Sequence, residues 1–132
     1  MDPNRIVVGT RVALGLVFFI VGTIGLLRLA PIPTYTGRAA DFLEALRATN
    51  YLWATINALQ VLCGALLGLG FFVPLMLVLL APLVFNIVLY HIFLEPVGLP
   101  IAVILLALEL FLAYCHRASF QSLFELKADP RL

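Results

Sequence analysis

Four long apolar stretches, separated by breaks rich in polar residues, glycine or proline, dominate the pattern along the chain. They run over 6–29, 52–72, 73–93 and 100–116. A helix that crosses a bilayer needs about 20 consecutive apolar residues, within a range of about 17 to 25. All four stretches meet this requirement, the last near its lower limit, so the pattern predicts four membrane-spanning helices.

The breaks between the last three stretches are short. Gly70 and Pro74 mark a tight turn between the second and third stretches, and proline suits the first turn of a helix. Pro96, Gly98 and Pro100 end the third helix and begin the fourth. We therefore predict an all-α fold, an integral membrane four-helix bundle with up-down-up-down topology, forming a single transmembrane domain over residues 1–132.

The longest break, residues 30–50, carries a helical pattern of its own. Its apolar residues follow the i, i+3, i+4, i+7 spacing of one helix face, and they are Ala39, Phe42, Leu43 and Leu46. Charged residues occupy much of the other side and are spaced to form the ion pairs Arg38/Asp41 and Glu44/Arg47. We predict a short amphipathic helix over about 38–49, lying at the membrane interface and ended by Asn50 in a left-handed conformation. A solvated connector is the alternative.

Small residues at helical spacing predict where two of the spans touch. Gly64 and Gly68 form a GxxxG motif on the second span, and Gly15, Gly22 and Gly25 cluster on the first. In a membrane such residues let two helix backbones approach closely. We expect these glycines to lie at helix contacts.

The composition narrows the class of protein. Hydrophobic residues make up 64% of the chain and charged residues 11%, against roughly 25% charged residues in soluble domains. The spans leave no room for a soluble catalytic domain, and membrane lipid is the expected surrounding. A net charge of +1 provides no basic surface to attract nucleic acid, so we exclude nucleic acid as a partner.

Basic residues near the helix ends predict the orientation, because they concentrate on the cytoplasmic side. The side with both termini holds Arg5, Arg11, Arg117, Lys127 and Arg131, against Arg28, Arg38 and Arg47 in the first loop. We therefore expect a multi-pass protein of the bacterial inner membrane with both termini in the cytoplasm.

Polar residues inside the predicted spans mark the candidate site, since such residues are costly in lipid. Gln60, Asn86 and Glu109 come out roughly 10 to 13 Å below the outer helix ends at about 1.5 Å per residue. We expect an outward-opening pocket with Glu109 as its floor, lined by Glu109, Gln60, Asn86, His91, Asn57, Arg28 and Tyr90.

Glu109 has two interpretations. Desolvation favours the neutral form of a carboxyl group, so Glu109 would be protonated and could carry protons. Alternatively, Glu109 bonds to Gln60 and Asn86 in a structural network between helices.

Other chemistry has little support in the sequence. His91 and Glu95 are spaced as a metal pair but lack a third ligand. His91 and His116 fall at opposite ends of the bundle and cannot ligate one haem. We expect no metal or haem, and no nucleophile elbow, P-loop or dinucleotide motif identifies a catalytic residue.

Three segments carry a family resemblance: residues 42–52, the Gln60-x3-Gly64 stretch, and residues 81–98 with their Ala-Pro…Asn…His pattern. In these the chain resembles the DoxX-like family of small four-helix bacterial membrane proteins. The resemblance implies a role in membrane redox processes such as thiosulfate oxidation coupled to quinone, or partnership with thioredoxin-like or oxidative-stress proteins.

The resemblance also bears on the site residues. It implies that Asn86, His91 and Glu109 belong to a pocket shared by the family. The chain departs from the family pattern at Gln60, where relatives often carry Glu, and at Asn50, where they often carry Gly. The first departure counts against a mechanism that needs a carboxylate on the second span.

Three functions follow as expectations. The first is a redox-associated inner-membrane subunit whose outward-facing pocket binds a quinone or a similar small apolar molecule with a polar head. It could be part of a quinone-linked oxidoreductase. The second is a non-catalytic scaffold that recruits a soluble redox or oxidative-stress protein, or assembles as a homo-oligomer. The third is a small proton-coupled transporter that uses Glu109.

Overall fold

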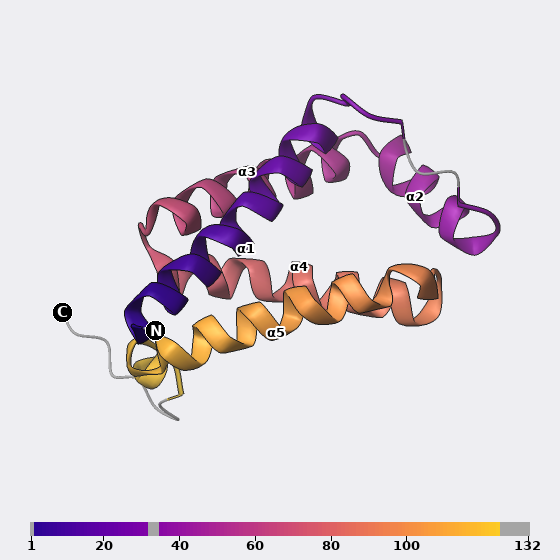
Figure 1. The fold of residues 1–132 in the computed structure, drawn as a ribbon. Coiled ribbons are helices and arrows are strands. Elements are labelled where there is room, and N and C mark those ends of the chain that lie inside the picture. Colours follow the sequence, from indigo (N-terminus) through magenta and orange to yellow (C-terminus); the bar gives the residue numbers. More distant parts are fainter. Residues whose placement is uncertain (1, 32–34, 125–132) are drawn as a thin grey trace.

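The computed structural model describes residues 2–31 and 35–124, and every regular element in these ranges is a helix (Figure 1). Four helices are long and apolar enough to cross a membrane, as the sequence predicted. They contain α1 (Pro3–Leu26), α3 (Tyr51–Leu69), α4 (Val73–Phe93) and α5 (Leu99–Cys115). The shorter elements are α2 (Arg38–Ala48) and the 3-10 helices η1 (Pro96–Gly98) and η2 (Arg117–Phe124).

Helix α1 begins and ends three residues before the predicted stretch of 6–29, because both of its ends are capped. The Asp2 side chain accepts a hydrogen bond from the backbone N–H of Asn4, at 3.0 Å, and Pro3 is the first helical residue. At the other end Arg28 takes a left-handed conformation (φ 53°). The N–H of Leu29 then bonds the carbonyl of Ile24, which closes the helix with a Schellman motif.

Helix α2 forms close to its predicted position. Asn50 has a positive φ (54°), but with ψ at -55° it does not take the predicted left-handed helical conformation. Asn50 also lies beyond Thr49, the residue that ends α2, and it directly precedes α3. The predicted ion pairs of this helix are wrong. Within the described ranges the only ion pair joins His91 to Glu95.

The long helices associate as two pairs (Figure 1). Helix α1 lies along α3, and α4 lies along α5. The pairs come together at the end of the molecule that holds the N-terminus and the α3–α4 turn, and they spread apart toward α2 and η1. Buried side chains from all four helices form the core, including Leu14, Phe18, Cys63, Leu67, Leu80, Val84 and Leu112.

Glycine makes the close contact between α1 and α3. A Cβ atom added to Gly15 would lie 2.6 Å from the backbone nitrogen of Gly68, and one added to Gly64 would collide with the backbone nitrogen of Phe19. One added to Gly22 would lie 2.8 Å from the carbonyl oxygen of Asn57. The predicted glycine contact is therefore confirmed, and it fixes the position of the polar residues on α3 relative to α1.

Candidate functional site

A cavity of about 660 Å³ lies between the two helix pairs, and we call it the main cavity. Helices α2, α3 and α4 line it, with one residue from α1 and none from α5. Most of its wall is apolar. The lining residues are Val21, Phe42, Leu43, Leu46, Leu52, Trp53, Ile56, Asn57, Gln60, Pro82, Leu83, Asn86, Ile87, Tyr90 and His91.

Two amide side chains enter the main cavity from α3, one turn apart. Asn57 and Gln60 are both buried, with exposed fractions of 6% and 8%. Asn57 Nδ2 donates a hydrogen bond to the carbonyl of Trp53, at 2.8 Å, within the same helix. The Oε1 atom of Gln60 is buried and has no hydrogen-bond partner among residues 2–31 and 35–124. An unpaired buried polar atom costs about 1 to 3 kcal/mol, so Gln60 is available to a ligand.

Helix α4 contributes Asn86, Tyr90 and His91 to the opposite wall. The Tyr90 ring packs against the rings of Tyr35 and Phe42, with centroids 6.4 Å and 5.7 Å away. The Tyr90 hydroxyl is also buried, and it has no hydrogen-bond partner in the part of the chain that the structure describes. Each of two helices that line the main cavity, α3 and α4, therefore carries a buried polar atom without a partner in the described ranges.

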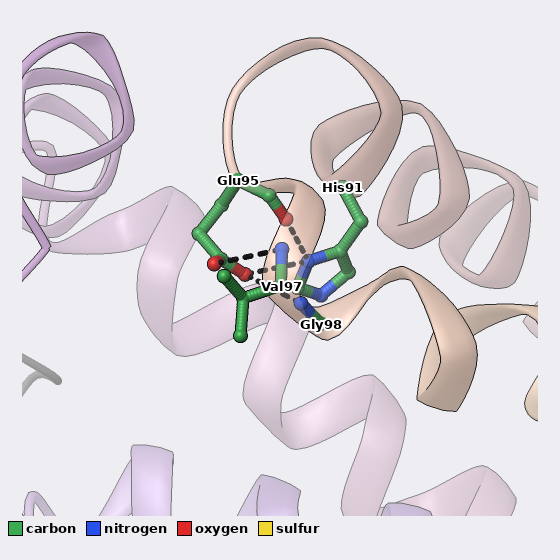
Figure 2. A network of polar contacts seen from close by, with 4 residues as sticks. All are labelled: His91, Glu95, Val97 and Gly98. Carbon is green, nitrogen blue, oxygen red and sulfur yellow. Dashed lines mark hydrogen bonds and ion pairs between the residues drawn. The ribbon is translucent and has the colours of Figure 1, made fainter.

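His91 also forms hydrogen bonds that connect α4 to the α4–α5 connector, as Figure 2 shows. Its Nδ1 atom lies 2.8 Å from the carbonyl oxygen of Glu95 and 3.0 Å from its carboxyl Oε2. Both neighbours are acceptors, so Nδ1 carries the proton and donates. The Glu95 carboxyl in turn accepts from the N–H groups of Val97 and Gly98. A side chain at Gly98 would collide with the His91 ring, so this close approach requires glycine.

Arg28 lies beside the main cavity rather than in it. It lines a second cavity of about 280 Å³, the arginine cavity, together with Arg47. The two cavities share Val21, Leu43, Trp53 and Asn57 as a common wall. The sequence analysis placed Arg28 in the pocket, whereas the structure places it beside the main cavity.

Glu109 lies in neither of these cavities. It lines a third cavity of about 510 Å³ beside α4 and η2. Successive residues on a helix point about 100° apart, so Phe85 faces Glu109 while Asn86 faces the main cavity. No hydrogen bond joins Glu109 to Gln60 or Asn86 in the structure, and the Oε1 of Glu109 has no hydrogen-bond partner within the described ranges. The prediction that Glu109 forms the floor of the pocket was wrong. The depth of a residue along a helix does not determine which face of the helix it lies on.

Sequence reasoning also missed part of the wall. The apolar side chains Phe42, Leu43 and Leu46 of α2 line the main cavity. Their helical spacing showed that one face of α2 is apolar. Such a face can pack against either a membrane surface or a protein cavity, so the spacing did not distinguish the two. Arg47 and Trp53 were likewise not assigned to a site.

The geometry suits a small, largely apolar ligand with a polar head. Binding pockets of about 300 to 1,000 Å³ are typically apolar and carry a few convergent polar groups. The main cavity fits this description, with Gln60 and Tyr90 unpaired and Asn57, Asn86 and His91 beside them. In the described ranges no three His, Cys, Asp or Glu residues are grouped to hold a metal ion.

Comparisons with protein-family models, curated proteins and solved structures find no match to this chain.

Proposed function

We propose that this protein is a redox-associated membrane subunit whose main cavity binds a quinone or a similar small apolar molecule with a polar head. The observation that carries the ligand proposal is the pair of unpaired atoms, Gln60 Oε1 and Tyr90 OH, on residues that line a largely apolar cavity. The redox association rests on the sequence resemblance to the DoxX-like family.

The polar groups suit both forms of such a ligand. A quinone carbonyl accepts hydrogen bonds, and the side chains of Tyr90 and Asn86 carry donors. A hydroquinone hydroxyl donates, and an amide such as that of Gln60 both accepts and donates. The ring would pack against Leu83 and Ile87 of α4. Because the chain itself offers donors and acceptors, it can hold either form without any change of protonation.

We also propose how the protein lies in its membrane. The four helices would cross the bacterial inner membrane up-down-up-down, with both termini in the cytoplasm and α2 at the outer interface. The excess of basic residues on the terminal side supports this orientation. The main cavity would then open toward the outer side.

Cysteine labelling tests the orientation. In a Cys115→Ser background, an impermeant thiol reagent added to whole cells should label Arg38→Cys and leave Lys127→Cys unlabelled until the membrane is broken. The reason is the basic-residue bias. Labelling of Lys127→Cys but not of Arg38→Cys in whole cells would reverse the proposed orientation.

Replacing Gln60 by leucine tests the ligand site. The purified wild-type protein should carry a quinone that solvent extraction and native mass spectrometry detect. Gln60→Leu should lower its occupancy at least about tenfold, because a hydrogen bond to the ligand is lost. The ligand-free variant should be as stable as the wild type or more stable, since the change removes an unpaired buried atom.

Gln121→Leu is the matched control, because Gln121 is exposed on η2 and lies outside the main cavity. It should leave the quinone occupancy unchanged. A Gln60→Leu variant that loses stability would show that Gln60 is a structural group. Isolation of the wild type with a soluble redox protein and no quinone would instead support the scaffold function.

A further inference from the structure

The arginine cavity brings together two positive side chains from different elements. Arg28 follows α1, and Arg47 lies in the last turn of α2. The lining of this cavity contains no aspartate or glutamate. Within residues 2–31 and 35–124 neither arginine forms an ion pair. This cavity therefore has a positive wall whose charge no carboxylate of the described chain neutralises.

Each guanidinium group contacts one neighbouring side chain, Asn50 for Arg28 and Trp53 for Arg47. The Nη2 atom of Arg28 donates to Asn50 Oδ1, at 2.8 Å, which uses one of its five N–H donors. The Arg47 guanidinium carbon lies 5.8 Å from the centroid of the Trp53 ring. Trp53 is itself fixed, because its Nε1 donates to the carbonyl of Gly25, at 2.9 Å. Most donors of the two arginines thus remain available.

The nearby helix ends do not balance this charge. The C-terminal ends of α1 and α2 each carry about half a negative charge. Arg28 and Arg47 carry two full positive charges, so roughly one unit of positive charge remains at the cavity. Arg28 also occupies a left-handed position where glycine is preferred. A guanidinium at this position therefore comes at some conformational cost to the backbone.

The rest of the cavity indicates what kind of anion fits. Val21 and Ile24 of α1 form an apolar wall below the arginines. Val21 lies five residues before the end of α1, or roughly 7 Å deeper along the helix axis. Trp53 lies in the first turn of α3, at the level where tryptophans meet the membrane interface. The site thus combines an anion-binding rim with an apolar wall that leads into the membrane.

We propose that the arginine cavity binds the phosphate group of an anionic membrane lipid. Guanidinium groups bind phosphate oxygens with paired hydrogen bonds, and the first acyl carbons would lie against Val21 and Ile24. The site is separate from the quinone site of the main cavity. Free phosphate offers the same head-group chemistry without the acyl chain, and the experiment separates the two sources.

Native mass spectrometry of the delipidated protein tests the proposal. The wild type should bind phosphatidylglycerol at least about tenfold more tightly than the zwitterionic phosphatidylcholine. Arg47→Gln should weaken phosphatidylglycerol binding about tenfold, and the double variant Arg28→Gln/Arg47→Gln should lose the preference. Arg47→Gln is the more informative single change, because Arg47 makes no side-chain hydrogen bond in the described ranges and its loss should not disturb folding.

Arg38→Gln is the matched control, since it removes the same charge from α2 outside the cavity. It should leave the preference intact. Equal losses in Arg38→Gln and Arg47→Gln would show a diffuse charge effect and overturn the site. If inorganic phosphate raised the melting temperature as much as phosphatidylglycerol does, the ligand would be free phosphate and not the lipid. Because Gln60→Leu leaves both arginines in place, failure of the quinone site would not affect these results.

Discussion

Gly64→Leu should destabilise the protein by about 3 kcal/mol or more, whereas Gly9→Leu should change its stability by less than about 0.5 kcal/mol. A side chain at Gly64 collides with the α1 backbone at Phe19 and would lie 2.7 Å from the carbonyl oxygen of Gly15. Backbone atoms of a packed helix cannot yield without moving the whole helix. At Gly9 no atom of residues 2–31 or 35–124 lies within 4 Å of an added Cβ atom.

Unfolding of the two variants in detergent, followed by circular dichroism, measures this difference. Gly64→Ala provides a graded test, because its Cβ atom alone already meets the Phe19 backbone. We expect its stability to lie between those of the wild type and Gly64→Leu. Equal unfolding midpoints for Gly64→Leu and Gly9→Leu would show that α1 and α3 do not pack through these glycines.

Glu109 should be protonated at neutral pH, and infrared spectroscopy should show a protonated carboxyl band that disappears in Glu109→Gln. The side chain is 4% exposed, and its Oε1 has no hydrogen-bond partner among the described residues. Taking an unpaired carboxylate out of water costs several kcal/mol even after the protein relaxes around it. Holding a proton on a free glutamate at pH 7 costs only about 4 kcal/mol.

Among the described residues that line the Glu109 cavity, Arg117 is the only cation, and it makes other contacts. Arg117 donates to the carbonyl of Tyr114, at 3.1 Å, and its guanidinium carbon lies 4.5 Å from the Tyr114 ring centroid. Arg117 forms no ion pair with Glu109 in the structure. Glu109→Gln should therefore fold as well as the wild type, since it keeps the shape of the neutral acid.

Glu44→Gln provides the control, because Glu44 is exposed on α2. Its substitution should remove intensity from the carboxylate band and leave the protonated band unchanged. If Glu109→Gln instead removed carboxylate intensity, Glu109 would be ionised and its cavity would contain water.

The amino-acid sequence alone determined the number of long apolar helices and the positions of the breaks between them. Both follow from local rules, since a span requires about 20 apolar residues and proline or glycine interrupts a helix. The predicted bounds of the third span, 73–93, agree with α4 (Val73–Phe93). The glycine contact was also predictable, because small residues at helical spacing have a direct consequence for packing in lipid.

Only the tertiary structure decided which polar residues share a cavity. Depth in the membrane follows from counting residues along a helix, and the count placed Gln60, Asn86 and Glu109 at similar levels. The direction in which each residue points depends on how its helix is rotated about its own axis relative to the neighbouring helices. Lipid is as apolar as a protein core, so the pattern of apolar residues does not reveal that rotation. For this reason the structure alone separated Glu109 from Asn86, and turned the apolar face of α2 toward the main cavity.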